Sequence, residues 1–252
     1  VGRQQLDKVA NTEPTGYGPF LVYGARNGQL VWHNYQIAFQ YRAYQVAPSI
    51  QLAPQYSSGY FVTVGTNGVV MVLTADHGQQ LWARTMLDRV VANPAVSDRA
   101  VYVASLDQHL RAYDLFTGNK KWETLTSSPL REDPILIGDD LFIEVPGQGL
   151  QCYEALPANS RRGVVRWENP DVGGDVMTRL RENLLVWDED AGLLRVLQGI
   201  DGAVAAEVSL PQVDVIRSSS RNGGEIFAAS DDGRVVRLLP RSTTGATASA
   251  TP

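Results

Sequence analysis

The side chains best suited to chemistry in this chain are its three histidines and its one cysteine. His33, His77 and His109 are far apart in the sequence and lack the close spacing of metal ligands on one element. Cys152 falls in a β-rich run, where burial makes a thiol unreactive, and a single cysteine forms no internal disulfide. These residues therefore predict neither nucleophilic catalysis nor a histidine or cysteine metal centre.

Two acidic turns offer oxygen ligands that calcium would accept. They are Asp188-Glu189-Asp190-Ala191-Gly192 and Ser230-Asp231-Asp232-Gly233. Aspartate before glycine is also what a tight turn between two strands requires. We expect turns here, and we predict no catalytic residue, no metal site and no bound cofactor.

The elements that carry these residues follow from a repeat. Four glycines are each followed four residues later by a tryptophan, and a fifth unit has Gly202 with Ala206 in the tryptophan place. The four pairs are Gly28 and Trp32, Gly78 and Trp82, Gly118 and Trp122, and Gly163 and Trp167. A recurrence at this period predicts a stack of four-stranded blades. We expect each tryptophan on an outer strand, covering the turn of a neighbouring blade and donating its indole N–H to a carbonyl.

Each unit also contains a run of β-branched and aromatic residues bounded by turn formers, which is typical of a strand. The runs are 61–64, 101–104, 141–144, 184–187 and 226–229. The sequence predicts an all-β chain.

The best copy of the repeat reads Ala112-Tyr113-Asp114-Leu115-Phe116-Thr117-Gly118-Asn119-Lys120-Lys121-Trp122. It resembles the tryptophan-docking motif Ala-x-Asp-x-x-x-Gly-x-x-x-Trp of the pyrroloquinoline-quinone-type β-propeller family, which includes quinoprotein alcohol dehydrogenases and BamB-like assembly factors. A second copy has Val72 and Thr74 for the alanine and aspartate, and a third has Cys152 and Glu154 before a longer connection. The resemblance covers roughly residues 18 to 240 and implies a β-propeller of four-stranded antiparallel blades.

The number of blades depends on the ends of the chain. The simplest count is five, with the N-terminal strand completing the blade formed by residues 214–239, because such closure removes unpaired strand edges. A count of six uses residues 35–46 as extra strands, and an open arc completed by another chain is the further alternative. We expect a polar lead-in over residues 1–16, one propeller domain over 17–240 and a flexible tail over 241–252.

The quinoprotein enzymes of the family imply a catalytic aspartate, a bound calcium, an arginine near the quinone and a disulfide between adjacent cysteines. One cysteine cannot form that disulfide, and the chain has about half of the eight blades that the family implies. We therefore expect a non-enzymatic protein without a cofactor, and a quinone-dependent dehydrogenase is the less favoured interpretation.

The charge and hydropathy of the chain disfavour some classes of binding partner. The net charge of −5 and pI near 5.2 disfavour nucleic acid and anionic membranes, which require a concentrated basic face. The sequence has no 18-residue apolar run that would span a membrane. Val1 fits a chain whose targeting segment has been removed, and it is not the cysteine of a lipoprotein anchor. We expect an extracytoplasmic location: periplasm, cell envelope or outside the cell.

The inner strands of the expected blades begin with small polar residues and have arginines nearby. We expect these residues to surround one mouth of the propeller and to form a polar rim that binds a partner, although they also suit backbone capping at strand starts. The candidate rim residues are Arg89, Asn93, Arg131, Asp133, Asp175, Arg179, Asp214 and Arg217.

Two functions without catalysis remain. One is a protein-binding scaffold of the cell envelope that resembles BamB-like assembly factors. The other is a structural subunit of a larger complex or surface array whose end strands pair with neighbours. The segment Tyr35 to Tyr41 alternates like a strand, and its aromatic residues favour the array if they are exposed.

Overall fold

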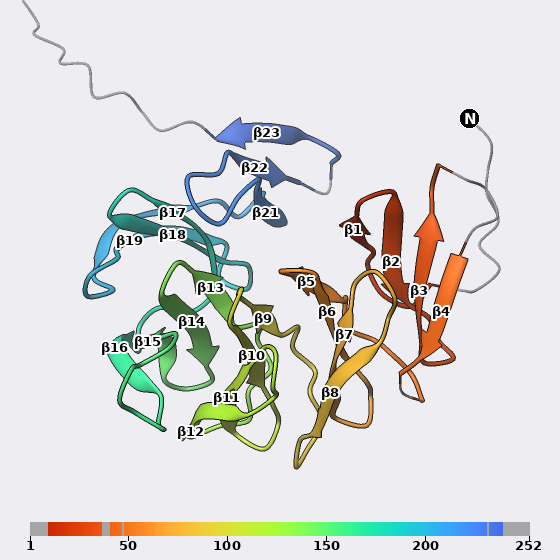
Figure 1. Cartoon of the computed structure of the whole chain (residues 1–252). Helices are drawn as coiled ribbons and strands as arrows, with labels where there is room; N and C mark the ends of the chain where they lie inside the picture. The colour runs from red at the N-terminus through yellow and green to blue at the C-terminus, as the bar shows by residue number, and fades with distance from the viewer. Residues whose placement is uncertain (1–9, 37–40, 47, 231, 239–252) are drawn as a thin grey trace, which may run out of the picture. The chain divides into compact units, whose positions relative to one another are not determined.

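The computed structural model describes residues 10–36, 41–46, 48–230 and 232–238. Over this part of the chain the protein is all-β, with 23 strands in six antiparallel sheets. Five sheets have four strands and the last has three, each in sequence order (Figure 1). The predicted β-propeller architecture of four-stranded blades is confirmed.

The sheets follow one another along the chain. The first contains β1 (Thr15–Tyr17), β2 (Phe20–Gly24), β3 (Gln29–Asn34) and β4 (Tyr41–Gln45). The second contains β5 (Gln55–Ser57), β6 (Tyr60–Val64), β7 (Val69–Thr74) and β8 (Gln80–Thr85). The third contains β9 (Ala95–Val96), β10 (Ala100–Ala104), β11 (His109–Asp114) and β12 (Lys120–Leu125). The fourth contains β13 (Ile135–Ile137), β14 (Asp140–Val145), β15 (Gly149–Glu154) and β16 (Val164–Asn169). The fifth contains β17 (Asp175–Leu180), β18 (Asn183–Asp188), β19 (Leu193–Gln198) and β20 (Val204–Ser209), and the sixth contains β21 (Val215–Ser218), β22 (Ile226–Ala229) and β23 (Val235–Leu238).

All five predicted β-rich runs form the second strand of a sheet. The second and third strands are buried almost throughout in the second to fourth sheets, which explains their near-continuous apolar sequence. In the outer strands β8, β12 and β16 the tryptophan is the one buried residue. In these three sheets the second and third strands are therefore buried, and on the outer strand only the tryptophan is buried.

The core lies between neighbouring sheets rather than within one. One cluster joins Tyr102, Ala112 and Trp122 of the third sheet to Leu141 and Tyr153 of the fourth. The stacking of Trp122 on Tyr153, with ring centroids 6.1 Å apart, belongs to the same junction. Sheet-to-sheet packing therefore depends on the side chains that the repeat places at each junction.

The N-terminal segment forms a sheet of its own, so the composite blade that we expected from the two chain ends is not formed. The inner strand β1 needs only three residues and turns into β2 through Gly18, whose φ of 54° is one that glycine adopts readily. Its first two residues lie within the segment predicted as the lead-in. Residues 41–45 supply the outer strand, so six sheets are present, as in the count that used residues 35–46.

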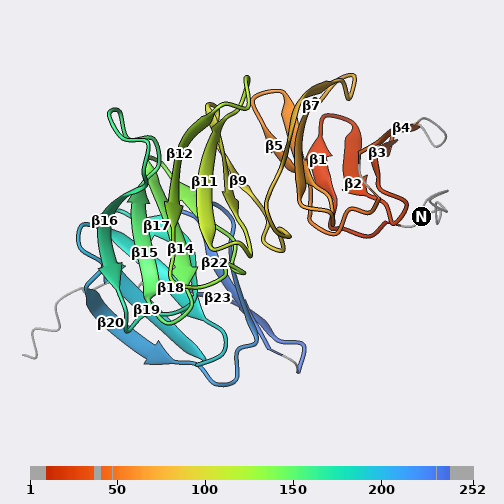
Figure 2. The ribbon, with the colours of Figure 1, turned by 90° about the horizontal axis from the view of Figure 1, so that it is seen from below.

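The chain divides into two compact units. The first is Val1–Asp175 with Ile200–Gly202, and the second is Val176–Gly199 with Ala203–Pro252. In the view of Figure 2, β11 and β12 of the third sheet lie side by side, as do β15 and β16 of the fourth. A single domain over 17–240 stays a prediction, and the predicted tail over 241–252 lies outside the described residues.

Candidate functional site

The tryptophans of the repeat fasten one sheet to the next. The indole N–H of Trp82 donates to the Leu115 carbonyl at 2.7 Å, and that of Trp122 donates to the Ala155 carbonyl at 2.8 Å. Each acceptor directly follows the third strand of the following sheet. A buried N–H and a buried carbonyl satisfy one another at each junction, which avoids the cost of leaving either unpaired.

The glycine of each turn lies beneath the tryptophan of the preceding sheet. A Cβ at Gly118 would lie 2.7 Å from the Trp82 ring, and a Cβ at Gly163 would lie 3.1 Å from the Trp122 ring. The Trp167 ring covers Gly202 of the fifth unit in the same way. Glycine is required because the turn at Gly118 has a φ of 65° and because the ring leaves no room for a side chain.

A β-bulge accompanies the tryptophan. The pairing of third and outer strands shifts by one residue next to Trp82, Trp122 and Trp167, and again at Ala206 in the fifth sheet. A bulge re-aims the side chain beside it. Periodicity alone gave no signal for this irregularity.

The first sheet makes its junction with a different strand. Gly28 lies in the turn between β2 and β3, and Trp32 lies on β3, not on the outer strand where we expected it. Trp32 nevertheless donates its indole N–H to the Ala75 carbonyl at 2.9 Å. Tyr44 of β4 supplies the ring that covers Gly78, and it packs edge-on against Trp32 with centroids 5.3 Å apart. At this junction Trp32 supplies the indole hydrogen bond and Tyr44 covers the turn glycine, whereas one tryptophan does both at the next two junctions.

The motif's aspartate holds the turn that the glycine completes. Asp114 Oδ1 accepts hydrogen bonds from the Phe116 and Thr117 amides at 3.1 and 2.9 Å, and Oδ2 pairs with Lys121 at 2.9 Å. Burial acts to raise the pKa of Asp114, but these partners outweigh it and lower the pKa to about 2. This carboxylate is structural.

The candidate rim contains a chain of hydrogen bonds between sheets. The Ala53 amide donates to Asn93 Oδ1 at 3.0 Å, and the Asn93 amide donates to Asp133 Oδ1 at 2.7 Å. The Asn93 side chain also donates to Asp133 Oδ2 at 2.9 Å. Asn93 and Asp133 each precede a proline that opens an inner strand, where the backbone is extended. Their polar groups are therefore committed to neighbouring sheets.

The arginines of the candidate rim differ in position. Arg89 and Arg131 are exposed near Asn93 and Asp133, and neither guanidinium forms an ion pair among the residues that the structure describes. Arg179 lies four residues beyond Asp175, inside β17. Since a strand rises about 3.3 Å per residue, roughly 13 Å separates the two along the strand.

In the sixth sheet, Asp214 precedes β21 and its amide donates to the Ala229 carbonyl at 2.9 Å. Arg217 lies within β21, where its guanidinium donates to the Ile216 carbonyl at 2.9 Å. The described hydrogen bonds thus join Asn93 to Asp133, and Arg89 and Arg131 are exposed in the segments that precede them. Asp175 is the last residue of the first unit's main segment, whereas Arg179, Asp214 and Arg217 belong to the second unit.

The residues that first suggested chemistry have ordinary structural partners. His77 Nδ1 lies 2.7 Å from Asp76 on an exposed turn, and His109 Nδ1 lies 2.8 Å from the Asp107 carbonyl. Cys152 is fully buried on β15. Asp188 accepts the Ala191 amide at 3.0 Å and pairs with Arg195 at 3.0 Å, as a turn requires. Within the described ranges no group of three or more histidine, cysteine or acidic residues is placed to hold a metal ion.

Successive four-stranded sheets joined by docked aromatic side chains define a β-propeller of the tryptophan-docking type. The chain matches the family model described as "Outer membrane protein assembly factor BamB" over residues 21–247, and it belongs to that family. The resemblance inferred from the repeat is confirmed.

Curated relatives carry the same description. The protein of Salmonella typhimurium is 24% identical over 208 residues, which cover 76% of this chain and 51% of the relative. The protein of Francisella salina is 27% identical over 73 residues, which cover 29% of this chain and 14% of the relative. The chain thus spans about half the length of the Salmonella relative, at 51%.

Two solved structures share the fold. The crystal structure of BamB from Moraxella catarrhalis has a TM-score of 0.58 at 17% identity, covering 94% of this chain and 84% of that one. A computationally designed protein, Ika8, has a TM-score of 0.72 at 14% identity, covering 91% of this chain and 70% of that one. At such identities the likeness concerns architecture. The described residues contain no helix that is long and apolar enough to cross a membrane.

Proposed function

We propose that this protein is a non-catalytic, protein-binding propeller module of the cell envelope that takes part in the assembly of outer membrane proteins. The family match over residues 21–247 is the observation that carries the proposal. Its binding surface is the part of the rim around Arg89 and Arg131, whose exposed guanidinium groups are available to carboxylates of another envelope protein.

The rest of that rim supports a binding role. Asn93 and Asp133 are held in place by bonds between sheets, so the surface that carries the two arginines is rigid before a partner arrives. A rigid surface loses little entropy on binding. Since the partner is reached through arginine, the surface favours an acidic face of that protein.

The test is chemical cross-linking in an envelope extract of the native cells, with the captured protein identified by mass spectrometry. We expect one identified outer-membrane assembly component to be captured by the unaltered chain and lost with the double variant Arg89→Ala and Arg131→Ala. The double variant Lys120→Ala and Arg162→Ala removes the same charge elsewhere and should retain capture. If both double variants capture the protein equally, the rim around Arg89 and Arg131 is not the binding surface.

Enzymatic activity is tested separately. We expect no alcohol-dependent dye reduction when the chain is supplied with pyrroloquinoline quinone and calcium. Turnover above a protein-free control would replace the scaffold proposal with the dehydrogenase.

A second function, the structural subunit, is favoured by the sixth sheet. No described strand pairs with the outer edge of β23, and Val235 and Val236 are 69% and 49% exposed. An exposed apolar edge recruits a strand from another molecule. Light scattering over a range of concentrations tests this: assembly that is abolished by Val236→Lys and retained with Val204→Lys on β20 supports the subunit. A 27.5 kDa monomer at all concentrations refutes it.

A further inference from the structure

The connection between β15 and β16 is longer than its counterparts. It runs over residues 155–163, whereas the equivalent connections are 75–79, 115–119 and 199–203. The additional residues lie alongside β12 of the preceding sheet. The Glu123 amide donates to the Arg161 carbonyl at 3.1 Å, and the Gly163 amide donates to the Glu123 carbonyl at 3.4 Å. The long connection is therefore fastened to its neighbour and forms a fixed wall.

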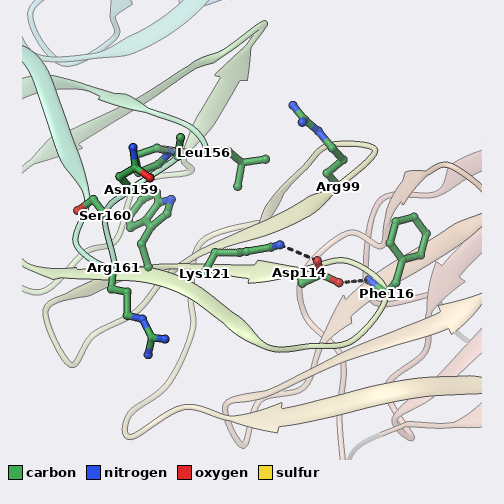
Figure 3. Close-up of a pocket in the computed structure, with 11 residues that line it drawn as sticks. Arg99, Asp114, Phe116, Lys121, Leu156, Asn159, Ser160 and Arg161 are labelled. Atoms are coloured by element: carbon green, nitrogen blue, oxygen red, sulfur yellow. Dashed lines mark hydrogen bonds and ion pairs between the residues drawn. The ribbon is translucent and has the colours of Figure 1, made fainter.

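This wall borders a surface cavity of about 570 Å³ that is open to solvent. Arg99 and Phe116 approach it from one side and Asn159 from the other, while Lys121 extends between them toward Asp114 (Figure 3). The volume lies in the range of pockets that bind ligands. All of these residues belong to the first compact unit, so the cavity is set by local packing.

The polar groups of the cavity favour an anion. Asp114 is the one carboxylate in its lining, and it is already satisfied by Lys121 and by the amides of the turn. Arg99 has only a distant ion pair with Asp98, at 3.8 Å, and its side chain is 66% exposed. Its guanidinium can thus donate to both oxygens of a ligand carboxylate, in the bidentate geometry that arginine prefers. Positive charge here contrasts with the net charge of −5 of the whole chain.

The lining also contains apolar residues beside its polar groups. Leu156 and Pro157 lie in the connection, and Phe116, which is 46% exposed, lies in the turn of the third sheet. The Asn159 side chain makes no hydrogen bond with another described residue, so its amide is available to a ligand backbone. An apolar side chain, a carboxylate and a peptide group are together the chemistry of a short acidic peptide.

We propose that this cavity binds an acidic peptide segment of a partner protein, with a carboxylate on Arg99 and Lys121 and a neighbouring apolar side chain against Phe116 and Leu156. The site is separate from the rim around Arg89 and Arg131, and it stands whether or not that rim binds. It gives the module a second point of attachment, and linking two weak contacts raises the overall affinity.

The experiment is fluorescence anisotropy with the whole chain and a labelled pentapeptide in which one phenylalanine is flanked by two aspartates. We expect binding that Arg99→Gln weakens by about tenfold, since a charge-assisted pair is lost. Arg162→Gln, adjacent to the lining but outside it, is the matched control and should bind as the unaltered chain does. The rim variant Arg89→Ala with Arg131→Ala should also bind normally, which separates this site from the proposed rim.

Peptide controls define the ligand class. A pentapeptide with lysines in place of the aspartates should not bind, and one with glycine in place of the phenylalanine should bind more weakly. Succinate should not displace the peptide at equal concentration. Equal binding of the lysine peptide, equal loss in Arg99→Gln and Arg162→Gln, or displacement by succinate at equal concentration would each overturn the proposal.

Discussion

The docking of Trp82 onto Gly118 can be tested with a matched pair of glycines. Gly118 and Gly138 both have a positive φ, of 65° and 62°. A Cβ at Gly118 would lie 2.7 Å from the Trp82 ring, whereas a Cβ at Gly138 would meet nothing within 4 Å. Alanine at either position therefore incurs strain from a positive φ, and only Gly118→Ala also displaces the ring.

The expected losses follow from these contacts. Gly138→Ala should lower the free energy of unfolding by about 1–2 kcal/mol, the cost of a left-handed conformation for a residue with a Cβ. Gly118→Ala should lower it by about 2–5 kcal/mol, because overpacking adds about 1–3 kcal/mol to that strain. Urea denaturation followed by far-ultraviolet circular dichroism measures both in the same compact unit.

A double-mutant cycle isolates the ring. In a Trp82→Ala background the ring nearest to residue 118 is removed, so Gly118→Ala should cost only its backbone strain. The coupling between the two sites should be about 1–3 kcal/mol. Equal losses from the two glycine variants in the unaltered chain, or no coupling in the cycle, would refute the view that Trp82 constrains this turn.

Three further predictions concern the same junctions. Trp122→Phe should lower the free energy of unfolding by about 1–3 kcal/mol, because it leaves the buried Ala155 carbonyl without its donor, as urea denaturation will measure. Trp187→Phe should cost less than Trp122→Phe, because the buried Trp187 N–H has no hydrogen-bond partner in the described structure. Asp114 has a folded pKa of about 2 against an ordinary 3.8, so its contribution to stability is present above pH 3.8 and is lost as the pH falls through about 2. Asp114→Asn should therefore flatten the loss of stability over that range in acid titrations, and an unchanged slope would contradict this.

Most of the architecture could be predicted because the same pattern of apolar strand, turn glycine and tryptophan recurs along the sequence. The second strands are largely apolar, and a glycine stands wherever an aromatic ring of the preceding sheet approaches the turn, at Gly78, Gly118, Gly163 and Gly202. Trp82 and Trp122 are then placed by their distance from the turn glycine.

Trp32 lies on a third strand instead of the expected outer strand, because the spacing between residues does not show which strand of a sheet they belong to. Val22 precedes Trp32 by the same interval as Val72 precedes Trp82, and both pairs lie directly opposite one another. One pair joins the second and third strands, however, and the other joins the third and outer strands. Nothing in the local sequence distinguishes these two hairpins, and only the short strand β1 shifts the count.

The rim and the cavity were harder to predict for a different reason. Asn93 and Asp133 are polar residues at strand starts, for which the sequence suggested either a rim or local backbone capping. Their hydrogen-bond partners lie instead in the segments that precede other sheets. The cavity forms because the long connection, residues 155–163, is hydrogen-bonded to β12. No sequence pattern in that connection predicts this pairing. The tryptophan contacts between repeats follow from spacing because they recur in each unit, whereas the contacts of Asn93, Asp133 and the long connection occur outside the repeated motif.

The comparison of junctions shows that the acceptor, rather than the tryptophan, is the fixed element of the repeat. Ala75, Leu115 and Ala155 each follow a third strand and each receive an indole N–H, although Trp32 reaches its acceptor from a third strand. A carbonyl at this position has completed its own sheet and requires a donor from outside it. The fifth sheet has Ala206 in the tryptophan place and an outer strand that is exposed throughout. Its packing onto the sixth sheet relies instead on Trp187 and Met177 against Ile216, without an indole hydrogen bond to a described residue. The two sheets of the second unit therefore have no indole–carbonyl pair at this junction, and the hydrogen bonds that do connect them, such as that from Arg221 to the Val176 carbonyl at 2.8 Å, lie elsewhere. Without the paired indole, we expect the amide protons of this unit to exchange faster than those of the first unit.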